Sequence, residues 1–228
     1  MTQPVMMFAA GFGTRMGALS AKQPKPLIHV AGRALIDHAL DLARAVDAAP
    51  IVANAHYRAE MLAAHLAPLA VQVTHETPDI LDTGGGLRAA LPLLGPGPVI
   101  TMNTDAIWSG PNPLSLLLRY WNPEVMDALL ICVPLDQAIG RKGTGDFTRM
   151  DDGRIQRGGD LVYGGVQILK TDGLAEIDAP VFSLNRLWDQ MQAQGRLFAH
   201  VYPGRWCDVG TPEGIPLAED LLRGGEHV

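Results

Sequence analysis

Short apolar runs alternate along the chain with longer segments in which apolar and polar residues recur at helical spacing. The first run, residues 5–10, is continuously apolar and ends in glycine, which predicts a strand buried on both faces. In residues 34–45 apolar side chains return every three or four positions, which predicts an amphipathic helix. The same reading predicts the strands 50–55, 71–75 and 99–102 and the helices 58–66 and 87–94.

The second half of the chain is richer in strand patterns. It predicts strands at 129–135, 162–169 and 197–202, a hairpin with arms 147–150 and 154–156 around Asp151-Asp152-Gly153, and a helix at 184–194. Such alternation predicts an α/β fold: a Rossmann-like, mostly parallel mixed sheet flanked by helices, with a small β-rich lid. Because the sequence has neither a repeat of fixed period nor a low-complexity linker, we expect one domain, 1–228, with halves 1–110 and 111–228.

Composition narrows the choice of partner and compartment. The chain has 228 residues, of which 47% are hydrophobic and 18% charged, enough apolar material for one substantial core. Its formal net charge is −6, which disfavours nucleic acid and anionic membranes as partners. Cys132 and Cys207 form no CxxC pair, so we expect neither a disulfide framework nor a zinc site. With no apolar run long enough for a membrane span and no basic leader, a cytoplasmic protein is expected.

The strand 5–10 runs into a glycine turn followed by basic residues. The turn reads Gly11-Phe12-Gly13-Thr14-Arg15-Met16, and Pro24-Lys25-Pro26-Leu27 comes soon after it. Glycine backbone lets N–H groups approach an anion closely, and Arg15 and Lys25 add two positive charges, an arrangement suited to a triphosphate. The motif is not a Walker A sequence, and Met16 occupies the third glycine position of the dinucleotide fingerprint, which weakens a nicotinamide-dependent dehydrogenase as an interpretation. A tight turn with surface basic residues is the plain alternative.

Two further places could contribute to a ligand site. The segment Leu81-Asp82-Thr83-Gly84-Gly85-Gly86 precedes the predicted helix 87–94, and its bare backbone would suit a flat base, a close chain crossing or a flexible turn. Asn103 and Asp105 follow the strand 99–102, at the carboxyl edge of a parallel sheet where ligands bind. Asp208 ends a later strand, but sequence alone does not pair it with Asp105, and a lone aspartate at a strand end is commonly a turn former.

Taken together these motifs resemble the sugar-1-phosphate nucleotidyltransferases. The glycine turn and Pro24-Lys25-Pro26-Leu27 resemble the family's G-x-G-T-R-M…P-K-P-L, Asn103-Thr104-Asp105 resembles its N-G-D, and Trp206-Cys207-Asp208-Val209-Gly210-Thr211 resembles its W-x-D-V-G-T. The segment 81–86 is similar to the L-E-T-G-G-G of the bacterial N-acetylmuramate-1-phosphate uridylyltransferases, with Asp82 in place of the glutamate.

The resemblance implies roles for individual residues. Asp105 and Asp208 would ligate Mg²⁺, Arg15 would neutralise the β- and γ-phosphates, and Lys25 would bridge the α-phosphate and the sugar phosphate. The implied nucleotide-binding residues are Ala10, Gly11, Gly13, Thr14, Arg15, Lys25, Thr83, Gly84, Gly85 and Asn103. The implied sugar-binding residues are Asp105, Gly145, Asp146 and Gly165, the last three in segments that resemble a G-x-G-D-F loop and the strand after it.

The implied reaction is uridylyl transfer from UTP to a sugar 1-phosphate, most specifically N-acetylmuramic acid 1-phosphate in peptidoglycan recycling. The lactyl carboxylate of that sugar would need a cation, for which Lys142, Arg157 and Arg205 are candidates. A mannose- or glucose-1-phosphate nucleotidyltransferase using GTP or another NTP is the alternative enzyme, and a non-catalytic nucleotide-sugar sensor is the alternative class. A monomer or weak homo-oligomer is expected, and His56 is expected to be structural rather than a ligand.

Overall fold

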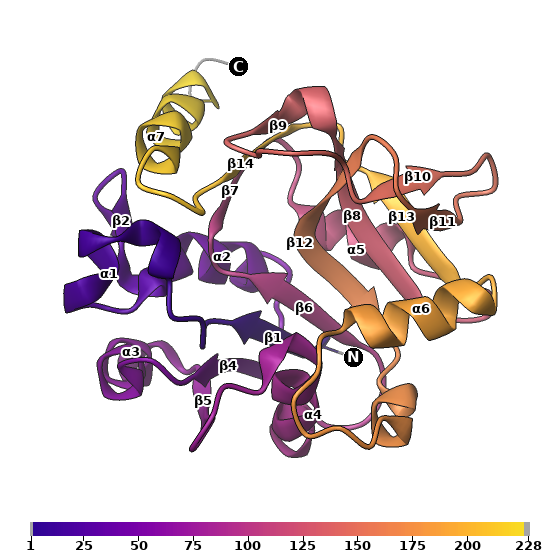
Figure 1. Cartoon of the computed structure of the whole chain (residues 1–228), viewed down its shortest axis with the longest axis horizontal. Helices are drawn as coiled ribbons and strands as arrows, with labels where there is room; N and C mark the ends of the chain where they lie inside the picture. The colour runs from indigo at the N-terminus through magenta and orange to yellow at the C-terminus, as the bar shows by residue number, and fades with distance from the viewer. Residues whose placement is uncertain (1, 226–228) are drawn as a thin grey trace.

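The computed structural model describes residues 2–225, and its centre is a nine-stranded sheet flanked by helices (Figure 1). The order along the sheet is β11-β10-β12-β6-β1-β4-β5, and β8 pairs with both β12 and β13. The strands are β1 (Val5–Phe8), β2 (His29–Val30), β3 (Arg33–Ala34), β4 (Ile51–Ala55), β5 (Gln72–His75), β6 (Val99–Asn103), β7 (Ala106–Ser109), β8 (Ala128–Pro134), β9 (Ala138–Ile139), β10 (Phe147–Arg149), β11 (Ile155–Arg157), β12 (Leu161–Leu169), β13 (Leu197–Val201) and β14 (Arg205–Asp208). The helices are α1 (Ala18–Lys22), α2 (Leu35–Arg44), α3 (Ala59–Leu66), α4 (Asp82–Leu94), α5 (Pro113–Tyr120), α6 (Asn185–Ala193) and α7 (Gly214–Gly225).

Strand β1 lies at the point where the strand order of the sheet reverses, with β4 and β5 on one side and β6 on the other. It pairs in parallel with β4 on one side and with β6 on the other, so that Met6 faces Val52 and Thr101. The continuously apolar run that predicted this strand is explained, because Met6 and Met7 are fully buried and belong to the apolar clusters on opposite faces of the sheet. A crevice is expected beyond the carboxyl ends of β1 and β6, because the connections leave this point in opposite directions.

The antiparallel part of the sheet comes from the second half of the chain. Strand β12 runs antiparallel to both β6 and β8, with an irregularity between Tyr163 and Val166. Gly165 has φ +86° there, and a Cβ on it would lie 2.9 Å from that of Asn103. Past this bulge β12 meets β10, where Leu161 faces Phe147, so the predicted hairpin of β10 and β11 extends the sheet beyond the end of β6.

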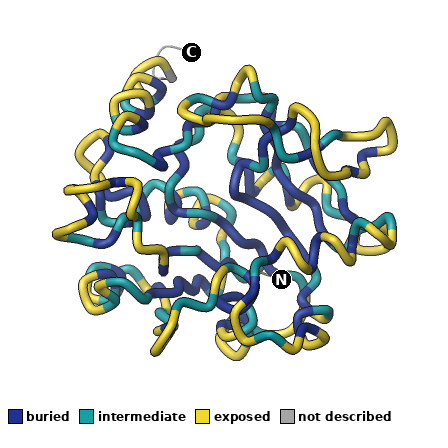
Figure 2. The backbone as a smooth tube through the Cα atoms, in the orientation of Figure 1, coloured by how far each residue is buried: buried dark blue, intermediate teal, exposed yellow. Residues whose placement is uncertain are grey.

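Helices cover both faces of the sheet and bury two apolar clusters (Figures 1 and 2). Helices α2, α3 and α5 contribute to one cluster, for example through Leu40 and Leu117. Helices α4 and α6 contribute to the other through Leu87 and Leu187. In Figure 2 the central strands are the dark, buried part of the tube, and the exposed positions lie mostly in loops and on the outer faces of the helices. The layers therefore match the predicted α/β class.

A second, three-stranded sheet brings two distant segments together at the crevice. Its order is β7-β14-β9, with Asp208 of β14 opposite Ala106 of β7, and α7 packs against it. The amide of Val209 donates to the carbonyl of Asp105 at 2.8 Å. The two aspartates that the sequence alone could not pair are thus neighbours.

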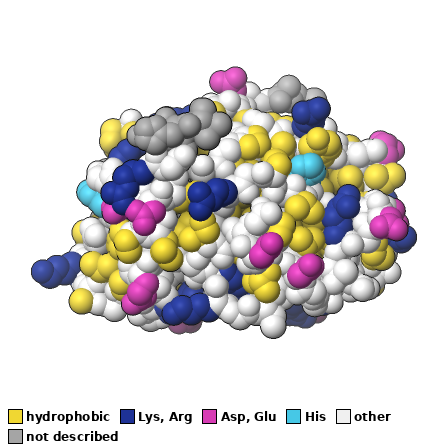
Figure 3. Space-filling model, turned by 90° about the horizontal axis from the view of Figure 1, so that it is seen from above, with side chains coloured by type: hydrophobic (Ala, Val, Ile, Leu, Met, Phe, Trp, Pro, Cys, Tyr) yellow, Lys and Arg dark blue, Asp and Glu magenta, His cyan; other side chains and the backbone are white. Residues whose placement is uncertain are grey.

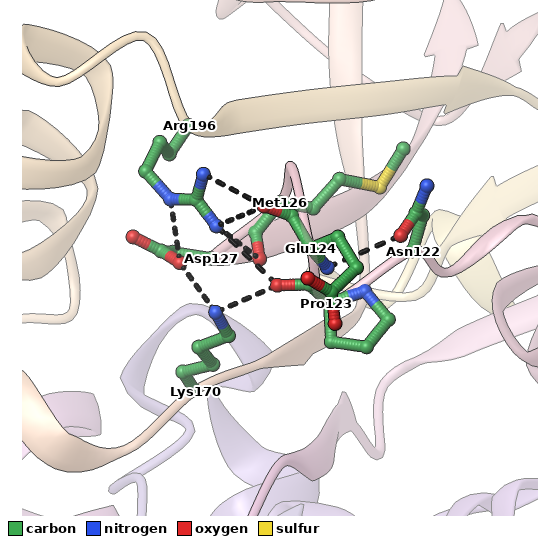
Figure 4. Close-up of polar contacts among 7 residues, drawn as sticks. All are labelled: Asn122, Pro123, Glu124, Met126, Asp127, Lys170 and Arg196. Carbon is green, nitrogen blue, oxygen red and sulfur yellow. Dashed lines mark hydrogen bonds and ion pairs between the residues drawn. The ribbon is translucent and has the colours of Figure 1, made fainter.

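At the opposite edge of the central sheet, an ion-pair cluster holds the chain before β8 (Figure 4). Lys170 Nζ and Arg196 Nε lie 2.9 and 2.8 Å from Asp127 Oδ1. The same two cations donate to carbonyls of the loop, Lys170 to Pro123 and Arg196 to Glu124 among others. Because the cluster satisfies carbonyls as well as a carboxylate, it fixes the loop and the ends of three strands in one place.

Several helices and short strands differ from the predicted elements, and strands β2, β3, β7 and β9 were not predicted. Helix α4 begins at Asp82, five residues before the predicted start, and α1, α5 and α7 were not predicted. Within the described residues, no helix is long and apolar enough to cross a bilayer. Both cysteines are free and buried. On the face shown in Figure 3, basic and acidic side chains are interspersed rather than gathered into a stripe of one sign.

Candidate active site

The glycine turn after β1 is shaped by its contact with Lys25. Gly13 has φ +63°, and a Cβ on it would lie 2.8 Å from the Cβ of Lys25. Glycine is required there both for its backbone conformation and for the close crossing. Gly11 has nothing within 4 Å of such a Cβ, so its backbone faces open space. Met16, which breaks the dinucleotide fingerprint, is fully buried and anchors the turn, while Arg15 beside it is exposed.

Lys25, Asp105 and Asp208 form the charged centre of the site. Lys25 Nζ lies 2.6 Å from Asp105 Oδ2, and the two side chains are only 12% and 29% exposed. Burial, and then the charge of Asp105, raise the pKa of Asp208, against the opposing influence of Lys25 and Arg15. A Cβ on Gly210 would lie 3.1 Å from a guanidinium nitrogen of Arg15 and 3.0 Å from a carboxylate oxygen of Asp208. Arg15 and Asp208 therefore converge on one point at the mouth of the crevice.

A cavity of about 260 Å³ opens at the carboxyl ends of β1 and β6. Of the predicted nucleotide-binding residues, it is lined by Ala10, Gly11, Lys25, Thr83 and Asn103, with Asp105 at its charged end. Phe8, Thr83 and Asn103 also line a second cavity of about 310 Å³, so the two adjoin.

The second cavity lies between β12, the β10–β11 hairpin and α6. Its lining residues include Phe147, Tyr163 and Trp188, of which Phe147 is fully buried, and the Trp188 ring meets the other two edge-on at 5.8 and 4.9 Å between centroids. Trp188 donates its indole N–H to the buried Gln167 Oε1 at 2.8 Å. A pocket that combines aromatic side chains with several polar and charged ones, beside a phosphate-binding site, is suited to a sugar.

Comparison with known proteins agrees with this geometry. The model of the MobA-like NTP transferase domain matches residues 5–159. The chain is 39% identical to an N-acetylmuramate alpha-1-phosphate uridylyltransferase of Caulobacter vibrioides, over 95% of this chain and 96% of the relative. It belongs to the sugar-1-phosphate nucleotidyltransferases.

More distant relatives and solved structures extend the picture. A probable mannose-1-phosphate guanylyltransferase 3 of Oryza sativa is 26% identical over 96% of this chain, which spans 65% of that protein. A putative glucose-1-phosphate thymidylyltransferase from Bacillus anthracis superposes with a TM-score of 0.80 at 15% identity, covering 100% of this chain and 96% of that one. The latter likeness shows the fold alone, which is that of a nucleotidyltransferase.

In this nucleotidyltransferase, the triple glycine packs closely against the segment around Phe182. Gly84 and Gly85 lie in the first turn of α4, and both amides donate to the carbonyl of Phe182, at 2.9 and 3.1 Å. A Cβ on Gly84 would lie 2.3 Å from the Phe182 ring, and one on Gly85 would lie 2.5 Å from the carbonyl of Pro180. Of the three interpretations that the sequence left open, the structure shows the close chain crossing for Gly84 and Gly85. Thr83 and Asp82 line the cavity instead.

The sequence also missed a buried polar network under the first cavity. Glu76, 2% exposed, accepts from Asn54 Nδ2 at 2.6 Å and from the amide of Leu81 at 2.7 Å. Asn54 in turn accepts from the amide of Ala9 at 2.8 Å. These bonds join the end of β1 to the segment before α4, so they position both walls of the nucleotidyltransferase cavity. His56 contacts the Glu76 carbonyl at 2.8 Å, which fits a structural histidine.

The predicted sugar-binding residues occupy different positions. Asp146 lines the second cavity, where its carboxylate accepts from Arg141 and from the amide of Tyr163, both at 2.9 Å. Gly145 and Gly165 do not line either cavity but permit close packing, Gly145 against the carbonyl of Gly159. Gly13, Thr14, Arg15, Gly84 and Gly85, and the predicted metal ligand Asp208, likewise lie outside the lining of the first cavity. The three aromatic residues of the second cavity and the amide of Gln167 were not predicted as site residues, because they come together only through tertiary packing.

Proposed function

We propose that the chain transfers a uridylyl group from UTP to N-acetylmuramic acid 1-phosphate, giving the UDP-sugar and pyrophosphate in peptidoglycan recycling. The observation that carries the reaction class is the approach of Lys25 Nζ to Asp105 Oδ2 at 2.6 Å, beside Asp208, in a cavity that adjoins a sugar-sized one. Support for the sugar comes from the 39% identity to a uridylyltransferase named for that substrate. Use of a nucleoside triphosphate and two free, buried cysteines support a cytoplasmic setting.

The attacking group is a phosphate oxygen that is already anionic, so the protein needs no general base and no covalent nucleophile. Catalysis then consists of positioning and charge stabilisation. Lys25 binds the α-phosphate and the incoming sugar phosphate, which lets two anions approach each other. Arg15 binds the phosphates that leave as pyrophosphate. Burial raises the pKa of the nearby Cys207 to about 11, with the charge of Asp208 adding to the effect, so this thiol stays neutral and takes no covalent role.

The donor set fits Mg²⁺. Asp105 and Asp208 supply the carboxylate oxygens that this ion prefers, and a divalent cation would offset both the burial and the charge of Asp105 that raise the pKa of Asp208. Among the described residues no cluster of three or more potential ligands occurs, which suits an ion that completes its shell with water and substrate phosphate. When bound, the ion would supply charge stabilisation at the α-phosphate. Lys25 keeps Asp105 oriented toward the cavity.

A second candidate, guanylyl transfer to mannose 1-phosphate, is supported by relatives such as the Oryza sativa protein at 26% identity. The test is a panel of the four common NTPs against several sugar 1-phosphates, with pyrophosphate release and the UDP-sugar product measured with and without a chelator. We expect the highest kcat/KM with UTP and N-acetylmuramic acid 1-phosphate, and loss of turnover with the chelator. A preference for GTP and mannose 1-phosphate would overturn the proposal in favour of the second candidate.

A further inference from the structure

The second cavity has an asymmetric charge distribution. Its charged lining residues are Asp146 and Arg157, set against the rings of Phe147, Tyr163 and Trp188. The carboxylate of Asp146 already accepts from Arg141 and from the amide of Tyr163. Arg157 therefore supplies the positive charge of this wall, and a negatively charged substituent would be attracted to it.

The guanidinium of Arg157 is held in place from two sides. Its Nε and Nη2 donate to Asp189 Oδ1 of α6 at 3.2 and 2.9 Å. On the other side it lies over the rings of Phe147 and Trp188, 5.0 and 5.4 Å from their centroids. A side chain fixed in this way loses less conformational entropy when it binds a ligand.

These contacts leave the cation able to bind. None of the hydrogen bonds to α6 uses Nη1, whose N–H groups can serve a ligand. The side chains of Arg157 and Asp189 are 38% and 64% exposed, so the pair is solvated and its net stabilisation is small. Asp189 orients Arg157 and offsets part of its charge, while Nη1 stays available to a ligand. By contrast, Lys142 and Arg205, the other two cations considered for this role, line neither cavity.

We propose that Arg157 binds a carboxylate on the sugar and so selects sugar 1-phosphates that carry one. The inference rests on the proposed function, in which this cavity receives the sugar. Tyr163 and the exposed edge of Trp188 pack against the apolar face of the sugar ring and its methyl-bearing substituents, while Arg157 pairs with the carboxylate. A site built around such a pair discriminates against the analogue that lacks the charged group.

The test compares N-acetylmuramic acid 1-phosphate with N-acetylglucosamine 1-phosphate, which lacks the lactyl ether. The wild-type enzyme is expected to prefer the former, and in Arg157→Gln the ratio of the two kcat/KM values is expected to fall by about 10- to 100-fold, mainly through KM. Calorimetric binding of the two UDP-sugar products repeats the comparison without turnover.

Two variants distinguish substrate binding by Arg157 from a structural role of its ion pair with Asp189. Asp189→Asn removes the ion pair but keeps Arg157, and it is expected to change the ratio by less than about threefold. Arg154→Gln, in the same hairpin but paired with the exposed Asp152, is the matched control and leaves the ratio unchanged. An unchanged ratio in Arg157→Gln, with wild type still preferring N-acetylmuramic acid 1-phosphate, overturns the role of Arg157 alone. Wild-type preference for the neutral sugar phosphate overturns the proposed substrate and this role together.

Discussion

Asp208 and Asp127 are partly buried aspartates at opposite ends of the parallel strands, and their pKa values are shifted in opposite directions. Asp105 follows the end of β6 with Asp208 beside it, whereas Asp127 precedes the start of β8, and the shared antiparallel partner β12 makes β6 and β8 run the same way. Burial and the neighbouring Asp105 raise the pKa of Asp208. Burial alone would raise the pKa of Asp127 too, but hydrogen bonds from Lys170 and Arg196 outweigh it and lower that pKa.

The comparison distinguishes a charged cluster suited to ligand binding from one that stabilises the fold. At the crevice, charge is left incompletely compensated, which costs stability and favours a cationic ligand. At the Asp127 edge, the carboxylate of Asp127 is paired with both Lys170 and Arg196, which stabilises the fold and leaves this carboxylate little charge to attract a ligand. The carboxylate at the crevice is thus the one whose pKa is raised, by burial and then by a like charge, whereas the pKa of the structural carboxylate is lowered.

The largest effect is expected from Asp208→Ala. Removing this carboxylate should lower kcat/KM by about 10³-fold, because phosphate transfer depends on charge stabilisation at this point. The folded state raises the pKa of Asp208, so its stability contribution falls as pH rises from the unfolded pKa through the folded one, and at neutral pH the charge destabilises the fold. Thermal melting without metal should thus occur at or above the wild-type temperature. Unchanged pyrophosphate release in this variant would contradict the assignment.

Lys25→Met tests the cation that pairs with Asp105 in the crevice. The variant keeps the apolar stem but removes the charge that faces Asp105, and kcat/KM is expected to fall by about 10²- to 10³-fold. Lys22→Met, an exposed lysine of α1, is the matched control and should change the kinetics little. Equal kinetics in the two variants would remove Lys25 from the catalytic residues.

Gly84→Ala tests the packing that forms the cavity wall. The added methyl group would overlap the ring of Phe182, so we expect a loss of about 1–3 kcal/mol in the free energy of unfolding. Gly224→Ala, at an open position of α7, is the control and should be neutral or slightly stabilising. Chemical denaturation of both variants measures the difference. A Gly84→Ala protein as stable as the control would show that the crossing tolerates a side chain.

How much the sequence could predict depends on how local each feature is. The buried strand, the glycine turn and Asp105 were predicted because each lies in one continuous segment, next to the strand end that places it. Helix α4 was predicted to start too late, because three glycines have poor helix propensity and tertiary contacts with Phe182 override it. Gln167 and Trp188 were not predicted as site residues, because they come together only when α6 packs beside β12.

The smallest effect is expected from Asp127→Asn, and it should be one of stability alone. Losing the ion pairs to Lys170 and Arg196 should lower the free energy of unfolding by about 1–2 kcal/mol at neutral pH, after allowance for their partial exposure.

The pH dependence of that effect should be opposite in sign to the one at Asp208. Because folding lowers the pKa of Asp127, its contribution is present above the unfolded pKa and disappears as pH falls through the folded one. The melting difference between wild type and Asp127→Asn should therefore shrink on acidification, with kcat/KM unchanged at neutral pH. Asp152→Asn, an exposed pair partner, serves as the control and should not alter melting measurably. A loss of activity in Asp127→Asn at wild-type stability would contradict this comparison, because it would show that the Asp127 ion-pair cluster affects the active site.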